Sequence, residues 1–445
     1  MGAAECVLLR GGSVVPMTRR GEVLAADVAL AGATITAVGS GLDVPAGTAV
    51  VDVSGCLVLP GFVQAHVHVV QSLARHRAEG LELLRWLAER IWPHEAALTP
   101  DEVAAAARLG IAELLCGGTT AVMDMGTTHD QDAVFAAAAE LGIRFASGKC
   151  HMDSGDDVPP RLVEDRDRSL AEAEALGGRW HGGANGRLRY AVAPRFVHSC
   201  SRELLLGTVA LARRHGWSLH THASESARET ELVRELTGRG NVAYLADLGL
   251  AGPDTVIAHG IHLDDEEYAA LARFRTGIAH CPGANLKLAS GIADLPRLLR
   301  EGIRVGLGAD GPACNNRLSI FHEMSLAGTL HNLRHGAGAV DPWTVLELAT
   351  WRSAEAIGLG GAVGRLEPGY RADVVVLDLA SWAMEPAGDI ATMIVHGAGE
   401  RDVRHVIVDG AFVVRDGALT TADGGRIRRE ARAAATSVEH RLGWS

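Results

Sequence analysis

The stretch GFVQAHVHVV, residues 61–70, places two histidines one residue apart within an apolar run. A β-strand alternates its faces with a period of two, so His66 and His68 point to one side and Val67 and Val69 to the other. Two imidazoles on one face, a few Å apart, can bind one cation together. They could equally be two solvated histidines on an edge strand, so the rest of the chain must decide.

Apolar, strand-like runs alternate with amphipathic helical stretches after this pair. The predicted strands cover residues 59–68, 118–125, 142–149, 186–194, 217–223, 255–260, 276–282 and 304–311. Eight βα units over roughly 300 residues favour an α/β fold of the (β/α)8, TIM-like barrel type. A doubly wound open sheet is the alternative.

Polar residues at the ends of the predicted strands favour the barrel. In a barrel these ends meet at the C-terminal face, where active sites lie. A single buried histidine after a strand is more often a core residue, but histidine or aspartate at the ends of six strands is hard to explain by burial alone. The strand-end residues are His66, His68, Asp124, His222, His259, His280 and Asp310.

Short strand-like runs separated by turn glycines occupy both ends of the chain. They predict one small β domain formed by residues 1–58 with 366–420, around a catalytic barrel of residues 59–365. Residues 421–445 have helical composition and a mixed-charge face, which predicts a C-terminal helical segment.

Composition restricts the classes of function. The 445 residues carry a formal net charge of −12, which argues against a general nucleic-acid binder. No apolar run reaches the roughly 18 residues of a membrane span, and the N-terminus lacks the pattern of a signal peptide. Seven scattered cysteines without a CxxC pair are typical of reduced thiols. We therefore expect a cytoplasmic protein with no nucleic-acid or membrane partner.

The strand-end residues suit zinc. Zn²⁺ favours imidazole nitrogen and carboxylate oxygen and lowers the pKa of its bound water to about 7. His66, His68 and His222 can supply three nitrogens, and Asp310 can supply a carboxylate. Glu225, three residues after His222, is a candidate base for that water, although a glutamate stabilised at a helix N-terminus would look the same.

An ordered set of motifs resembles the amidohydrolase superfamily, in its deaminase and triazine-hydrolase branch. The motifs are GFVQAHVH, HTHASE, IAHG, HCPGANLKLASGI, GLGADG and GRLEPGYRADVVVLD. The resemblance runs from about residue 5 to residue 420 and implies a barrel with a small β domain, often assembled as a homo-oligomer. It implies one catalytic zinc ion per chain, with iron as the alternative.

The same resemblance assigns roles to individual residues. His66, His68, His222 and Asp310 would be the metal ligands, and Glu225 would be the proton shuttle. His259 would orient the water or the tetrahedral intermediate, and Asp310 would also accept a hydrogen bond from that water. Some relatives bridge two metals with a carboxylated lysine. Lys149 ends the third predicted strand rather than the fourth, so we interpret it as structural.

The segment LRWLAERIWPHEAALT resembles deaminases of adenosine derivatives, and it implies that Trp86 and Glu95 line a nucleoside pocket. A carboxylate can accept hydrogen bonds from both hydroxyls of a ribose. The segment APRFVHSCS, with Arg195 and Phe196, resembles guanine deaminases and a 5′-deoxyadenosine deaminase-like group. Gln71 matches a guanine-binding glutamine. Trp86 and Glu95 could also belong to an ordinary amphipathic helix.

These features predict a zinc-dependent aminohydrolase that acts on the C–N bond of a cyclic amidine. Its substrate would be a 6-aminopurine nucleoside such as 5′-deoxyadenosine, 5′-methylthioadenosine or S-adenosylhomocysteine, with release of ammonia. The alternatives are a deaminase of a free base or related heterocycle (guanine, oxopurine, pterin or aminotriazine) and a non-catalytic metal-binding scaffold.

Overall fold

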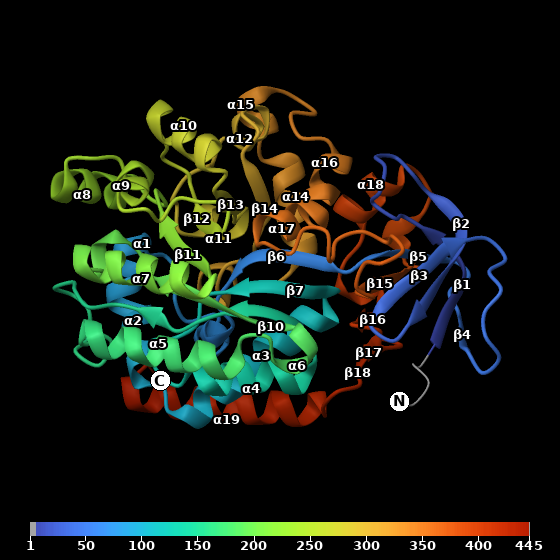
Figure 1. The fold of residues 1–445 in the computed structure, drawn as a ribbon, viewed down its shortest axis with the longest axis horizontal. Helices are drawn as coiled ribbons and strands as arrows, with labels where there is room; N and C mark the ends of the chain where they lie inside the picture. The colour runs from blue at the N-terminus through green and yellow to red at the C-terminus, as the bar shows by residue number, and fades with distance from the viewer. Residues whose placement is uncertain (1–5, 445) are drawn as a thin grey trace.

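Eight parallel strands form a barrel in the computed structural model, which describes residues 6–444 (Figure 1). Residues 1–5 and Ser445, at the outer ends of the predicted segments 1–58 and 421–445, lie outside the described residues. The barrel strands are β6 (Phe62–Val67), β7 (Thr119–Asp124), β8 (Arg144–Ser147), β10 (Leu188–Pro194), β11 (Ser218–Ala223), β12 (Thr255–His259), β13 (Gly277–His280) and β14 (Arg304–Leu307). They pair in that order, with the short β9 (Cys150–His151) beside β10. The predicted (β/α)8 barrel is confirmed.

The barrel closes where its first and last strands meet. Val67, at the end of β6, forms a parallel bridge with Asp310, just after β14. The Asp310 N–H donates to the His66 carbonyl at 3.1 Å, and the His68 N–H donates to the Asp310 carbonyl at 3.4 Å. Gly308 allows this close approach, because a Cβ there would lie 2.5 Å from the His66 carbonyl oxygen. Three predicted metal ligands, His66, His68 and Asp310, therefore lie at the seam where β6 meets the end of β14.

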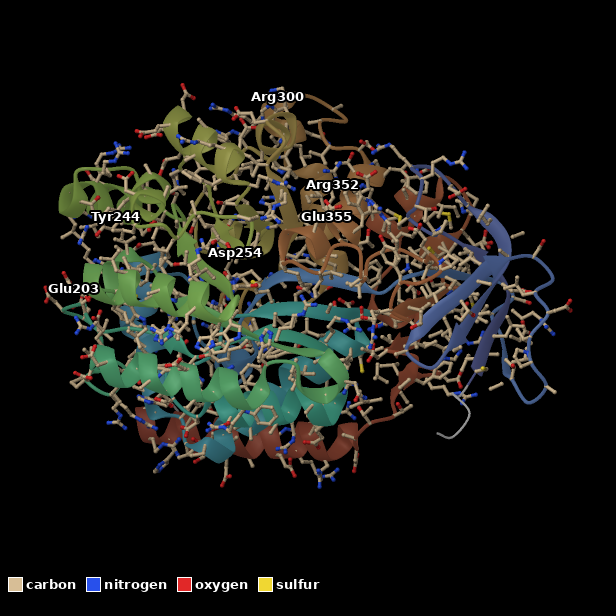
Figure 2. The ribbon with its side chains drawn as sticks, in the orientation of Figure 1. Glu203, Tyr244, Asp254, Arg300, Arg352 and Glu355 are labelled. Atoms are coloured by element: carbon tan, nitrogen blue, oxygen red, sulfur yellow. The ribbon has the colours of Figure 1, made fainter. Side chains whose placement is uncertain are left out.

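Helices surround the barrel, and the ends of the longer ones follow from their sequence. Thr99 and Glu102 form a capping box at the start of α3, and Gly216 ends α7 with a φ of 66°. Their outer faces carry charged side chains such as Glu203 on α7 and Arg300 on α12 (Figure 2). These helices are α3 (Pro100–Cys116), α4 (Gln131–Leu141), α5 (Arg166–Trp180), α6 (Gly183–Gly186), α7 (Arg202–His215), α8 (Ala227–Thr237), α9 (Asn241–Asp247), α10 (Asp265–Phe274), α11 (Pro282–Lys287), α12 (Leu295–Arg300), α13 (Pro312–Asn315), α14 (Ile320–Thr329), α15 (Asn332–His335), α16 (Pro342–Leu348) and α17 (Trp351–Ala356).

A second sheet combines strands from both ends of the chain and lies at one side of the barrel (Figure 1). Its members are β1 (Cys6–Val14), β2 (Leu24–Ala31), β3 (Thr34–Gly39), β4 (Ala49–Asp52), β5 (Cys56–Pro60), β15 (Val374–Asp378), β16 (Val403–Val408), β17 (Ala411–Arg415) and β18 (Ala418–Leu419). The two ends of the chain join where β5 pairs antiparallel with β15. Arg144 of the barrel ties the two sheets together through a buried ion pair with Asp373 at 2.9 Å.

The single strand predicted over residues 59–68 is two strands. β5 ends at Pro60 in the small sheet, and β6 begins at Phe62 in the barrel. Gly61 lies between them, where a Cβ would come within 2.2 Å of the Thr120 side chain. The run is apolar throughout because both strands are buried, so its composition does not reveal the change of sheet.

Short helical segments lead from β6 across the mouth of the barrel. They are η1 (Val69–Ala74), α1 (Leu83–Trp86), η2 (Leu87–Ile91) and α2 (Trp92–Ala97). Other short segments are η3 (Val197–Ser199), η4 (Trp382–Met384), α18 (Ile390–Thr392), η5 (Met393–Gly397) and η6 (Glu400–Asp402). The last helix, α19 (Gly424–Leu442), runs along α3 (Figure 1), and Arg441 near its end donates to the Ala97 carbonyl at 3.0 Å. In the described part of the chain, no helix combines the length and the apolar character needed to cross a membrane.

Candidate metal centre and substrate pocket

Three strand ends bring the predicted ligands together at the C-terminal face of the barrel. His66 lies in β6 and His68 follows it, His222 lies in β11, and Asp310 follows β14. Asp310 Oδ1 lies 3.3 Å from His66 Nε2 and 3.5 Å from His68 Nε2. His68 Nε2 lies 3.2 Å from His222 Nε2. The side-chain atoms of His66, His68 and Asp310 form a group that could hold one metal ion.

On the side away from the cluster, the Nδ1 atom of each of these imidazoles makes a hydrogen bond. His68 Nδ1 lies 2.9 Å from the Met125 carbonyl oxygen, and His222 Nδ1 lies 2.8 Å from the Arg195 carbonyl oxygen. A carbonyl oxygen only accepts, so both rings donate from Nδ1 and turn an unprotonated Nε2 toward the centre. This outward bond fixes the tautomer of metal-ligating histidines.

The third imidazole, that of His66, makes its Nδ1 hydrogen bond with His220. His220 is not among the residues predicted from the sequence. His220 Nε2 lies 2.9 Å from His66 Nδ1. His220 and His222 are two residues apart on β11, so their side chains share one face of the strand. That second HxH spacing was the signal available in the sequence.

The ring nitrogens at the centre are buried and in the form that binds metal. Burial lowers the pKa of His66, brings that of His68 to about 3 and holds that of His222 well below its usual value. Metal binding requires neutral imidazole. His66 Nε2 is buried with no hydrogen-bond partner among the described residues. A buried, unpartnered nitrogen beside two more imidazoles and a carboxylate fits a metal ion.

Glu225 and His259 lie next to this cluster. Glu225 Oε2 is 3.4 Å from His259 Nε2, and His259 Nε2 is 3.8 Å from Asp310 Oδ2. Burial, and then the charge of Asp310, raises the pKa of Glu225 well above its usual value. Glu225 can therefore hold a proton near neutral pH, as a general acid–base group requires.

The backbone is strained at this point. Ser224, His259 and Asp310 have positive φ values of 54°, 75° and 58°. Non-glycine residues adopt this region rarely, and such positions concentrate at functional sites. Asn285 supports His259, because its Oδ1 lies 2.9 Å from His259 Nδ1. Asn285 lies in the motif HCPGANLKLASGI, but nothing in its spacing predicts this contact.

A pocket with about 360 Å³ of space opens directly above the cluster. Its polar floor contains the candidate ligands His68, His222 and Asp310 together with Glu225 and His259, and its walls are apolar on one side. Gln71 and Arg195 form the polar wall. The apolar wall consists of Leu83, Trp86, Leu87 and Phe196. The sequence does not predict that Leu83 and Leu87 line the pocket, because their four-residue spacing is common to the buried face of any helix.

Glu95 and Arg195 form a buried ion pair beside this pocket. The two contacts join Arg195 Nη1 to Glu95 Oε2 at 2.6 Å and Arg195 Nη2 to Glu95 Oε1 at 3.2 Å. Gln71 Nε2 also donates to Glu95 Oε1, at 3.2 Å. Burial opposes ionisation of Glu95, but the Arg195 guanidinium outweighs it and lowers the pKa. Both Glu95 oxygens are thus engaged within the protein.

Three other residues singled out in the sequence lie outside the cluster. Lys149 is fully buried and pairs with Glu164 and Glu172 at 2.7 and 2.8 Å. The carboxylate of Asp124 accepts from the Val69 N–H at 2.9 Å, which fixes the backbone immediately after His68. His280 packs against His331, with ring centroids 5.5 Å apart.

A (β/α)8 barrel whose strand ends carry an imidazole and carboxylate metal site, with a buried acid–base glutamate beside it, defines a metal-dependent hydrolase. Comparison with known proteins gives the family. The model of the amidohydrolase family matches residues 57–413, and the chain belongs to this family of metal-dependent enzymes that hydrolyse C–N bonds.

The relatives lie in the branch expected from the motifs. A 5-methylthioadenosine/S-adenosylhomocysteine deaminase from Natronomonas pharaonis is 38% identical over 90% of this chain and 91% of its own. The crystal structure of an adenosine deaminase from Xanthomonas campestris with bound zinc is 29% identical, covers 98% of both chains and has a TM-score of 0.91. The atrazine chlorohydrolase from Arthrobacter aurescens, complexed with zinc, is 26% identical and covers 96% of this chain and all (100%) of its own, with a TM-score of 0.90.

Proposed function

We propose that the protein is a hydrolytic deaminase of 6-aminopurine nucleosides, which releases ammonia from an adenosine derivative such as 5′-deoxyadenosine, 5′-methylthioadenosine or S-adenosylhomocysteine. One observation carries the proposal. The pocket places a buried glutamate of raised pKa, Glu225, between an imidazole and carboxylate cluster and an aromatic wall formed by Trp86 and Phe196. The names of the relatives support the same substrate class.

The metal in this proposal is zinc, one ion per chain, held by His66, His68, His222 and Asp310. Such an ion would supply hydroxide at neutral pH, because it lowers the pKa of its bound water to about 7. The grouping of His66, His68 and Asp310, with His222 Nε2 3.2 Å from His68 Nε2, supports zinc, and so does the zinc in the structure of the Xanthomonas relative. Iron is the alternative metal.

Glu225 moves the proton in the reaction. It takes a proton from the attacking water and delivers it to the ring nitrogen beside the amino-bearing carbon. Asp310 accepts a hydrogen bond from that water, and His259, whose Nε2 lies 3.4 Å from Glu225 Oε2, orients the water or the tetrahedral intermediate. The carbon–nitrogen bond to the amino group then breaks, the amino group takes the proton of the added hydroxyl and leaves as ammonia, and the oxygen becomes the ring carbonyl.

The walls of the pocket bind the nucleoside. Trp86 and Phe196 pack against the purine, and Gln71 and Arg195 contact its polar edge. Glu95 accepts hydrogen bonds from the two ribose hydroxyls. To do so, its carboxylate gives up part of its hydrogen bonding to Arg195. The ion pair that Glu95 makes without substrate keeps its carboxylate charged, and this supports a role as an acceptor.

The remaining features of the proposal concern the whole molecule. The small domain comprises residues 1–58 with 366–420, the catalytic barrel residues 59–365, and the C-terminal segment residues 421–445. The two separate sheets support this division, except that Leu59 and Pro60 belong to β5 of the small sheet. We place the protein in the cytoplasm as a homo-oligomer that takes a small heterocyclic substrate, without a nucleic-acid or membrane partner. The scattered cysteines and the acidic net charge support this placement.

An ammonia-release assay of the zinc-loaded protein tests the function. The panel pairs adenosine, 5′-deoxyadenosine, 5′-methylthioadenosine and S-adenosylhomocysteine with adenine, guanine, a pterin and an aminotriazine. We expect the highest kcat/KM for a 6-aminopurine nucleoside. A preference for any free base or triazine would contradict the substrate class while leaving the deaminase chemistry intact.

A further inference from the structure

A second, strongly basic groove lies behind the candidate site, between the segment that follows η1 and the last helix, α19. It encloses about 700 Å³ with its open mouth included, roughly twice the space of the substrate pocket. Its basic residues are Arg75, His76 and Arg77 from the chain after η1, and Arg428 and Arg432 from α19. None of the described residues that line it is a carboxylate.

Only part of this positive charge is compensated. Arg75 pairs with Glu113 and Arg77 with Glu439. Arg75 Nε is nevertheless buried without a hydrogen-bond partner in the described region. Within residues 6–444, neither Arg428 nor Arg432 has a carboxylate within 4.0 Å, although both are exposed to solvent.

The arrangement on α19 is unfavourable without a ligand. Arg428 and Arg432 are four residues apart on one helix, so they face the same side, and like charges at this spacing destabilise a helix. They lie across the groove from the guanidinium groups of Arg75 and Arg77. Arg75 and Arg77 are each paired with a carboxylate, so the excess positive charge at the groove comes from Arg428 and Arg432, in a chain with a net charge of −12. An anion in the groove would turn this repulsion into attraction.

The residue type indicates which anion. Guanidinium presents its N–H groups in a planar fork that matches the oxygens of a phosphate. Arg428 and Arg432 are unpaired on one wall, and Arg75 and Arg77 are partly paired on the other. Together these four arginines offer more hydrogen-bond donors than one phosphate can accept. The ligand class is therefore a small molecule with at least two phosphate groups.

The groove and the substrate pocket share the helix η1. Ser72 and Leu73 of η1 line the groove, whereas Gln71 lines the substrate pocket. α19 contacts η1 directly. The N–H of His76 also donates to Asn316 Oδ1 at 3.0 Å, at the end of α13, the helix that follows Asp310. A ligand between η1 and α19 would therefore bind next to the backbone that carries the candidate site.

We propose that the groove between residues 75–77 and α19 is a binding site for a small bis- or polyphosphorylated metabolite, distinct from the substrate pocket.

Titration calorimetry on the metal-loaded protein at low ionic strength tests this site. The probes are fructose 1,6-bisphosphate and inositol hexakisphosphate, with inorganic phosphate as the single-phosphate comparison. None of them contains a purine. We expect one bis- or polyphosphate per chain, much weaker binding of inorganic phosphate, and affinity that falls as salt is raised. The double variant R428A/R432A should lose at least about tenfold in affinity, because two charge-assisted contacts are removed.

A matched control lies on the same helix. The double variant R426A/R429A removes the same charge from α19, but these arginines do not line the groove and lie near Glu430 and Asp423. It should keep affinity within about threefold of the parent. R428K/R432K keeps the charge and should bind better than the alanine pair. Circular dichroism verifies that each variant is folded.

Three results would overturn the proposal. One is the absence of saturable binding by either multiphosphate probe. Another is an equal loss of affinity in R428A/R432A and R426A/R429A, which would mean attraction to charge in general. The third is an oligomer that dissociates in R428A/R432A while the parent binds no probe, which would assign the groove to contact between two copies of the chain.

Discussion

Arg195 and Glu95 are 100 residues apart in sequence and form a two-point ion pair beside the substrate pocket, with side chains only 5% and 8% exposed. Breaking a buried pair by removing one partner leaves an uncompensated charge and typically costs about 3–5 kcal/mol. The pair therefore stabilises the mouth of the barrel and also sets the charge of the pocket wall. A substitution of Glu95 has to be assayed so that its effect on stability is separated from its effect on substrate binding.

Glu95→Gln should penalise nucleosides and spare free bases. The amide keeps the shape of Glu95 but loses the charged acceptor for the ribose diol. One lost hydrogen bond to a charged group predicts a decrease of about 1.5–3 kcal/mol in transition-state binding, or roughly 10- to 150-fold in kcat/KM. The measurement is kcat/KM for each nucleoside and its base. Glu89→Gln, an exposed change in η2, is the control. An equal loss for nucleoside and base would show that Glu95 acts only through the fold.

Removal of the metal should abolish activity, and one equivalent of zinc per chain should restore it. His222→Ala deletes one of the four candidate ligands, so it should lower both metal content and activity, whereas exposed His440→Asn should change neither. Metal analysis by mass spectrometry, together with ammonia release, checks this. Two equivalents of metal in the fully active protein would contradict a mononuclear centre.

Glu225→Gln should keep the metal and the fold but lose at least 10²–10⁴-fold in kcat, the range typical of general acid–base groups. The measurement combines steady-state kinetics with metal content and a thermal melt. Glu231→Gln, on the exposed side of α8, should retain the activity of the parent. Activity of Glu225→Gln within a few fold of the parent would leave Glu225 as a residue that only stabilises a helix start.

Glu323 should make stability depend on pH. It is buried, accepts from Asn315 Nδ2 at 2.7 Å and from the Gly283 N–H at 2.9 Å, and burial raises its pKa from 4.5 to about 7. The folded state therefore holds this proton more tightly than the unfolded state. Its contribution to stability is fully present below pH 4.5 and is lost as the pH rises to about 7, by up to roughly 3 kcal/mol.

Glu323→Gln should therefore flatten the decrease in unfolding free energy between pH 4.5 and 7, because the amide does not titrate. Urea unfolding at several pH values measures this slope. An exposed carboxylate on another helix, changed in Glu203→Gln, should leave the slope unchanged. Parallel slopes in the parent and in Glu323→Gln would show that other groups determine the pH dependence.

The fold and the ligand cluster were predictable because they depend on local periodicity. The period of two in His66 and His68, and polar residues at successive strand ends, required only that parallel strands end at one face. The change of sheet at Gly61 was not predictable, because both strands are buried and read as one apolar run. The pairing of Glu95 with Arg195 depends on where the segment after β6 folds over the barrel mouth, which neither residue's neighbours determine.

Because β6 and β14 must meet to close the barrel, the candidate metal site can be completed only late in the synthesis of the chain. His66 is made early, His222 midway, and Asp310 only with the last barrel strand, whose end bridges back to Val67. A growing chain therefore has an incomplete set of ligands until its barrel can close. An ion held by this set would therefore be captured late, after the first and last strands of the barrel have met.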